Sequence, residues 1–306
     1  MQTTVKTDIF LRGIGLHSGC AVTLRILPAP AGTGVCFKRT DRVDGDPVGP
    51  ARWDLVERTP LCTKLVNADG VSVSTVEHLM AALAGCGVHN AVVEISGGEV
   101  PILDGSSEPF VAAILKSGLR QLHAPIRAIE VLKTVQVRKE RAWARLDPAA
   151  NLSIAFEIDF PDAAIGHQAR ALNMANGAFV RELCNSRTFC RQADVDAMRA
   201  VGKGLGGSLS NAVVVEGAEV LNPDGMRYPD EPVRHKMLDA LGDLALANGA
   251  LLGAYKGYRA GHSLTNTLLR ALFADSSAYR IVSLDAGKAG LLPGVGVSFD
   301  DLRHVA

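Results

Sequence analysis

Residues 232–244 have the sequence PVRHKMLDALGDL, and this stretch predicts one amphipathic helix. One face is apolar and consists of Val233, Met237, Leu241 and Leu244. His235, Asp239 and Asp243 follow one another at four-residue spacing on the other face. Positions four apart on a helix lie over each other, with β-carbons roughly 5–6 Å apart. His235 and Asp239 can therefore direct an imidazole nitrogen and a carboxylate oxygen at a single cation.

The chain around this helix predicts mixed α and β structure, because short apolar runs alternate with Gly-rich and Pro-rich turns. The expected elements are strands near 127–138, 142–146 and 152–160, the helix ending at Asn248-Gly249, a strand at 251–255, and a helix over 264–273 opened by Gly261-His262-Ser263.

The first half of the chain repeats this order. Its expected elements are strands at 3–11, 20–27 and 34–38, a helix from Ser74 to the glycines at 85 and 87, a strand at 91–95, a polar turn at 104–109, and a helix over 110–116. We therefore expect an α+β fold of two similar domains, residues 1–122 and 123–306, that meet near Leu119–Arg127. A doubly wound sheet is less favoured, because strands and helices do not alternate one by one.

Composition excludes several classes of protein. The 306 residues are 47% hydrophobic and 21% charged, which is ordinary for a globular chain. The chain has 32 Lys and Arg residues and 32 Asp and Glu residues, so its net charge does not indicate a nucleic-acid-binding protein. The six cysteines have no CxxC spacing and indicate free thiols, typical of a reducing compartment. No targeting segment or membrane-spanning run is present, so a cytoplasmic protein is expected.

Two interpretations of the histidine–acid pairs remain open from spacing alone. His235 and Asp239 supply two of the three protein ligands of a typical catalytic zinc, or form an ordinary ion pair on a helix. Residues 74–77, Ser-Thr-Val-Glu, fit a capping box that would explain Glu77 structurally. The functional interpretation makes His78 the third ligand and Glu77 a base near a water molecule on the metal.

His262 stands at the start of a predicted helix, whose positive dipole end disfavours the imidazolium. Asp243 could bond one ring nitrogen, orient the ring and restore its basicity. Thr188, in the stretch Ser186-Arg187-Thr188-Phe189, offers a hydroxyl of the kind that stabilises an oxyanion. Each residue also has a plain structural interpretation when it is taken alone.

Together these stretches resemble one family, the UDP-3-O-acyl-N-acetylglucosamine deacetylases of lipid A biosynthesis. The resemblance covers nearly the whole chain, and the motifs occur in the family's order. They are GIGLHSG at 13–19, STVEHL at 74–79, DGSS at 104–107, SRTF at 186–189, RHKMLDALGD at 234–243 and Gly261-His262.

The resemblance implies an amidohydrolase that removes the N-acetyl group from UDP-3-O-acyl-N-acetylglucosamine, giving UDP-3-O-acyl-glucosamine and acetate. It implies His78, His235 and Asp239 as zinc ligands, in a set that ferrous iron can also occupy. Glu77 would be the general base, Thr188 the oxyanion donor, and His262, oriented by Asp243, the acid. The implied fold has two βααβ-type sandwiches with the active site between them and a small insertion in each.

Lys236 resembles the family's lysine near the sugar-phosphate part of the substrate, and the insertion near 190–215 would form the acyl passage. Further candidate substrate-binding residues are Leu61, Phe189, Gly207 and Phe160, where Phe160 either stacks on uracil or is a buried strand residue. Lys64 and Ala142 depart from the family's usual residues, which puts the uridine-diphosphate contacts in question.

Two rival functions remain. A non-haem iron oxygenase also uses two histidines and one carboxylate, but it would consume oxygen. A nucleotide-sugar or lipid binding protein with a structural zinc would need a fourth protein ligand, and none is evident. The expected partner is the UDP-linked acylated glucosamine. We expect no nucleic acid, at most transient membrane contact through the insertion, and a monomer.

Overall fold

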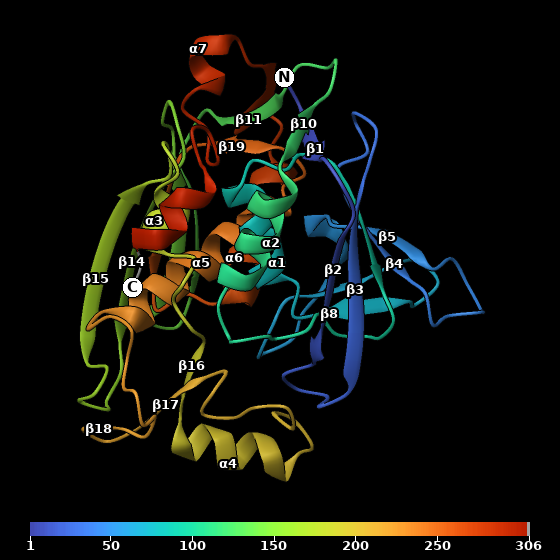
Figure 1. Ribbon diagram of the computed structural model, residues 1–306. Helices are drawn as coiled ribbons and strands as arrows, with labels where there is room; N and C mark the ends of the chain where they lie inside the picture. The colour runs from blue at the N-terminus through green and yellow to red at the C-terminus, as the bar shows by residue number, and fades with distance from the viewer. Residues whose placement is uncertain (305–306) are drawn as a thin grey trace.

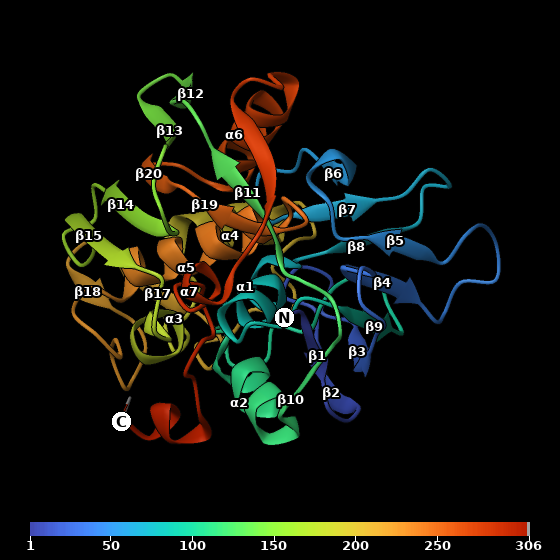
Figure 2. The ribbon, with the colours of Figure 1, turned by 90° about the horizontal axis from the view of Figure 1, so that it is seen from above.

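The computed structural model describes residues 1–304. Its two halves each contain a five-stranded sheet (Figures 1 and 2). In spatial order the first sheet consists of β2 (Ile9–Ile14), β3 (Ala21–Pro28), β9 (Ala91–Ile95), β4 (Val35–Arg39) and β5 (Val48–Pro50). The second consists of β12 (Val135–Lys139), β13 (Ala142–Asp147), β20 (Ala254–Tyr258), β14 (Ser153–Asp159) and β15 (His167–Asn173).

The two sheets have the same topology. In each, the last strand along the chain inserts between the second and third, and pairs parallel only with the third, β9 with β4 and β20 with β14. Burial alternates along strands such as β14, so each sheet covers the core with one face. The repeated order of elements and the α+β class predicted from the sequence are confirmed.

Four helices lie between the two five-stranded sheets (Figure 2). They are α1 (Glu77–Gly85), α2 (Glu108–Ser117), α5 (Glu231–Ala245) and α6 (His262–Ala274). Helices α1 and α5 pack directly against each other, and one large hydrophobic core runs through both halves. Gly242 permits this contact, because a β-carbon there would overlap the carbonyl oxygen of Glu77.

Smaller elements complete each half. One three-stranded sheet contains β6 (Val56–Glu57), β7 (Lys64–Val66) and β8 (Ser72–Ser74), and another contains β16 (Phe189–Arg191), β17 (Val213–Glu216) and β18 (Glu219–Val220). With α4 (Gln192–Ala200), the second sheet projects from the body at the foot of Figure 1. The remaining elements are β1 (Thr3–Val5) with β10 (Leu119–Gln121), β19 (Ala250–Leu252) with β11 (Arg127–Val131) and β21 (Tyr279–Ser283), η1 (Trp53–Leu55), α3 (Ala178–Glu182), α7 (Ala286–Ala289) and η2 (Phe299–His304).

Four predicted elements were wrong in detail. The strand expected at 3–11 is divided into β1 and β2. The stretches expected near 127–138 and at 251–255 are divided into β11 and β12 and, at Gly253, into β19 and β20, and the members of each pair belong to different sheets. The helix expected from Ser74 begins at Glu77, because Ser74 ends β8 and Thr75 has a φ of 56°. The proposed domain boundary at 122/123 lies between β10, which pairs with β1, and β11.

Candidate active site

Three buried side chains from the two halves converge where α1 meets α5. His78 lies in the first turn of α1, and His235 and Asp239 lie one turn apart on α5. One potential ligand atom from each lies within 4.8 Å of the others. The Nε2 atoms of His235 and His78 are 3.3 and 3.7 Å from Oδ1 of Asp239. Residues 157 positions apart in the chain, His78 and His235, thus face one carboxylate.

The protonation of this cluster suits a metal ion. Burial, and then the neighbouring His235, lowers the pKa of His78 to about 3, and burial also lowers the pKa of His235. Burial opposes ionisation of Asp239, but His235 and Lys236 outweigh it and hold its pKa well below the usual range. Oδ1 of Asp239 is buried and accepts no hydrogen bond. Neutral imidazoles and carboxylate oxygens are ligands that zinc prefers in proteins, and this carboxylate oxygen has no hydrogen-bond donor within the protein.

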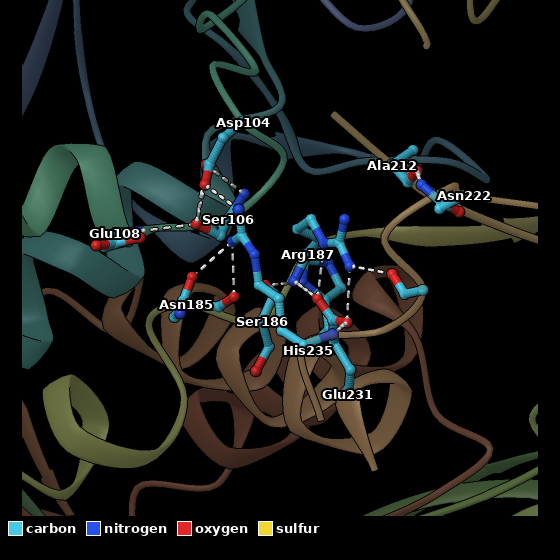
Figure 3. Close-up of polar contacts among 12 residues, drawn as sticks. Asp104, Ser106, Glu108, Asn185, Ser186, Arg187, Ala212, Asn222, Glu231 and His235 are labelled. Atoms are coloured by element: carbon cyan, nitrogen blue, oxygen red, sulfur yellow. Dashed lines mark hydrogen bonds and ion pairs between the residues drawn. The ribbon is translucent and has the colours of Figure 1, made fainter. Parts of the chain in front are cut away.

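The polypeptide before α5 orients His235. Its Nδ1 donates to the carbonyl oxygen of Ser186 at 3.0 Å, which leaves the Nε2 lone pair directed at the cluster. The Ser186 carbonyl is held in turn by its neighbour Arg187, whose guanidinium forms two bonds of 2.9 and 3.1 Å to Glu231 at the start of α5. Glu231 is fully buried, and Figure 3 shows the pair beside Ser186 and His235.

The turn at 104–107 supports the same site from the first half of the chain. Ser107 donates its hydroxyl to the carbonyl oxygen of His78 at 2.8 Å, and the carbonyl of Gly105 accepts from the backbone N–H of Thr188 at 2.8 Å. Gly105 has a φ of 89° and lies so close to the carbonyl of Asn211 that a β-carbon would overlap it. Figure 3 shows Asp104 and Ser106 of this turn.

A second group of titratable residues lies beside the cluster. Nδ1 of His262 is 2.9 Å from Oδ2 of Asp243, and its Nε2 is 3.6 Å from Oε1 of Glu77. Burial raises the pKa of Glu77 to about 7. Burial disfavours the His262 imidazolium, but Asp243, Glu77 and Asp239 outweigh it and raise the pKa of His262 to about 9. The three carboxylates thus outweigh the cost of burying the imidazolium.

Thr63 connects the acid and base candidates, and sequence analysis gave it no role. Its backbone N–H donates to Oε2 of Glu77 at 3.1 Å, and its hydroxyl donates to Oδ1 of Asp243 at 2.5 Å. The capping box considered for residues 74–77 is wrong. Glu77 is the first residue of α1, and the hydroxyl of Ser74 bonds to Gly98 instead.

A cavity of about 820 Å³ opens onto these side chains. Every predicted site residue lines it except Asp243, which lies behind His262. These residues are Glu77, His78, His235, Asp239, His262, Thr188, Lys236, Leu61, Phe189, Gly207 and Phe160. Lys236 Nζ pairs with Oδ2 of Asp239 at 2.6 Å, and the rings of Phe160 and Phe189 meet edge to face with centroids 5.5 Å apart.

The other large cavity, of about 350 Å³, contains none of the predicted residues. It lies beside the carboxyl ends of α1 and α5 and is lined mainly by apolar side chains. Its buried polar groups are paired within the protein, as Asn90 is with Gly34 and Gln2. The larger cavity, with its cluster of titratable side chains, is therefore the candidate active site.

Comparison with known proteins agrees with this geometry. The chain is 44% identical over 286 residues, 93% of each chain, to the UDP-3-O-acyl-N-acetylglucosamine deacetylase of Shewanella frigidimarina. It is 43% identical over 304 residues, 97% of this chain and 99% of the relative, to the enzyme of that name from Shewanella oneidensis. The profile of the LpxC family, UDP-3-O-acyl N-acetylglycosamine deacetylase, matches residues 2–274. The chain belongs to the LpxC family.

Proposed function

We propose that this protein hydrolyses the N-acetyl group of UDP-3-O-acyl-N-acetylglucosamine to give UDP-3-O-acyl-glucosamine and acetate, an early step of lipid A biosynthesis. The observation that carries the proposal is that one cavity is lined by a His-His-Asp cluster and, beside it, by the Glu77 carboxylate facing the His262 imidazole. The names of the full-length relatives supply the substrate.

His78, His235 and Asp239 would hold zinc, and ferrous iron fits the same ligands. Bound there, the ion would lower the pKa of a coordinated water toward neutrality and polarise the amide carbonyl. The proposal is supported by the neutral imidazoles and by the buried Oδ1 of Asp239, which accepts no hydrogen bond.

Glu77 would act as the general base that takes a proton from the attacking water. A base works best with a pKa near the working pH, and burial raises the pKa of Glu77 to about 7. The N–H of Thr63 occupies Oε2 of Glu77. Oε1 faces His262 and remains available to the water and its proton.

His262 would protonate the departing amine, since an amide nitrogen leaves poorly without a proton. Asp243 accepts from Nδ1, so the second proton of the imidazolium resides on Nε2, on the side of Glu77. The hydroxyl of Thr63 anchors Asp243 and so stops the carboxylate from turning away. Thr188 would donate its hydroxyl to the oxyanion that develops on the amide carbonyl.

The rest of the cavity would hold the substrate. Its walls near α4 and residues 201–209 are mainly apolar and suit an acyl chain. Phe160 and Phe189 would contact the nucleotide-sugar end, and Leu61 and Gly207 the acyl chain. Lys236 pairs with Asp239 in this structure. A metal ion bound to Asp239 would free the Lys236 ammonium for the substrate phosphate.

Among the described residues, no helix is both long enough and apolar enough to cross a bilayer. From the family's place in lipid A biosynthesis we propose that the enzyme is a cytoplasmic monomer, with at most transient membrane contact through the insertion. Val201 and Leu205, at the edge of that insertion, are 74% and 59% exposed.

The decisive experiment combines metal analysis with an assay of acetate release from the UDP-linked substrate, before and after chelation. Zinc at one ion per chain, loss of turnover on chelation and its return with zinc under anaerobic conditions are the expected results. Full turnover in rigorously metal-free protein would contradict the proposal. A requirement for oxygen would favour the oxygenase instead.

A further inference from the structure

Glu99 is a buried carboxylate that the mechanism above does not use. It lies between β9 and α2 and is 5% exposed. Its Oε1 accepts from the backbone N–H of His17 at 2.8 Å and from the hydroxyl of Thr75 at 3.1 Å, and its Oε2 accepts from the N–H of Ser18 at 2.8 Å. A buried charge is costly unless it is hydrogen-bonded, and three donors make this one tolerable.

The loop that Glu99 holds, residues 15–19, forms part of the cavity wall through Leu16 and His17. A β-carbon on Gly15 would overlap the Glu99 carboxylate, so glycine permits the close approach. On its other side the loop carbonyls accept from the insertion, Leu16 from the N–H of Gly206 at 3.0 Å and His17 from that of Leu205 at 3.3 Å. The loop therefore lies between Glu99 and the insertion.

Thr75, the third partner of Glu99, is buried and lines the same cavity. Its φ of 56° is a conformation that β-branched residues rarely adopt. Such a conformation persists only where the surroundings impose it, and the bond to Glu99 is one contact that does so. A single carboxylate thus fixes two neighbouring pieces of the wall.

We infer that Glu99 is a positioning residue for substrate binding, which holds the 15–19 loop and Thr75 as one wall of the cavity. The inference rests on the proposed deacetylase function. Glu77 is anchored separately, by α1 and by the N–H of Thr63. Loss of the Glu99 charge should therefore affect the binding of the substrate more than the chemical step.

The test is Glu99→Gln in the full chain loaded with zinc. The amide keeps the size of the side chain but loses the charge and one acceptor oxygen. We expect KM for the UDP-linked substrate to rise about tenfold, which equals about 1.4 kcal/mol of binding free energy. We expect kcat to change less than about twofold, because the lost binding affects the ground state and the transition state equally. Zinc content should stay the same, and the His17 and Ser18 amides should exchange their hydrogens faster.

Glu94→Gln is the matched control, the same change on β9, where Glu94 pairs with Arg25 and Lys38 away from the loop. It should change neither KM nor the exchange of the loop amides. Glu99→Asp keeps the charge with a shorter reach and should give an intermediate KM, which provides the test if Glu99→Gln does not fold.

Unchanged KM and unchanged amide exchange in Glu99→Gln would overturn the inference. So would a fall in kcat that follows loss of zinc, because Glu99 would then only support the fold. If the wild-type protein releases no acetate, the proposed function fails, and amide exchange still reports whether Glu99 holds the loop.

Discussion

Glu77 and His262 influence each other's protonation, because their side chains face each other in a buried site. The proposed mechanism requires Glu77 without its proton and His262 with one. The raised pKa values, about 7 and about 9, place both groups in these states over an interval near neutral to mildly alkaline pH. A cation in the adjacent cluster would lower both values by repelling the protons.

A profile of kcat/KM against pH should therefore be bell-shaped, rising as Glu77 loses its proton and falling as His262 loses its own. Glu77→Gln should lower kcat by about 10²- to 10⁴-fold and remove the rising limb, while His262→Gln removes the falling limb. Bound zinc, measured alongside, should be unchanged in both. Full turnover of zinc-loaded Glu77→Gln would refute the assignment of the base.

Glu231 lies outside the cavity but supports the backbone that orients His235, a proposed metal ligand. Its loss would leave the buried Arg187 guanidinium without its carboxylate partner, with only the bond to the carbonyl oxygen of Gly225, and would loosen the Ser186 carbonyl that orients His235. Glu231→Gln should cost about 3–5 kcal/mol of unfolding free energy and weaken zinc binding about 10- to 100-fold. Urea unfolding and competition with a chelator measure the two effects. Glu182→Gln, at a partly exposed carboxylate that pairs with Arg170 and Arg234, should cost less, about 1 kcal/mol.

At the scale of elements, the contact between α1 and α5 determines the site, because each helix carries part of it. Gly242→Ala would place a methyl group against the Glu77 carbonyl and push the two helices apart. We expect a loss of about 1–3 kcal/mol in stability and reduced turnover. Gly287→Ala in α7, where a β-carbon meets only ordinary contacts, should leave both unchanged. A fully active Gly242→Ala enzyme would contradict the need for this close packing.

At the scale of the whole molecule, zinc should tie the two halves together, because His78 comes from one half and His235 and Asp239 from the other. An ion that binds only the folded chain stabilises it by about 2.7 kcal/mol at a hundredfold excess over its Kd. Chelation should thus lower Tm by roughly 5 °C in a single cooperative transition. His78→Ala should abolish the shift, whereas the exposed His123→Ala should retain it. Two separate transitions would show that the halves unfold independently.

The helix at 232–244 was predictable because its periodicity is local. Four-residue spacing alone places His235 and Asp239 on one face of the helix. Apolar residues at every second position predict strands such as β14. The resemblance of six short motifs to one family then supplied candidate roles for residues in both halves. These parts of the fold and site depend on residues within a few positions of one another, or on short sequence motifs that match those of a known family.

Tertiary structure decided what no short-range pattern contains. Thr63, the Ser186 carbonyl and Glu99 have their roles through backbone atoms and through partners 14 to 180 residues away, which leave no trace in spacing. Helix α1 begins at Glu77 and not at Ser74 as predicted, because Ser74 belongs to β8 and Thr75 has a left-handed backbone conformation. Helical periodicity places side chains on a face, but the path of the whole chain decides which faces meet.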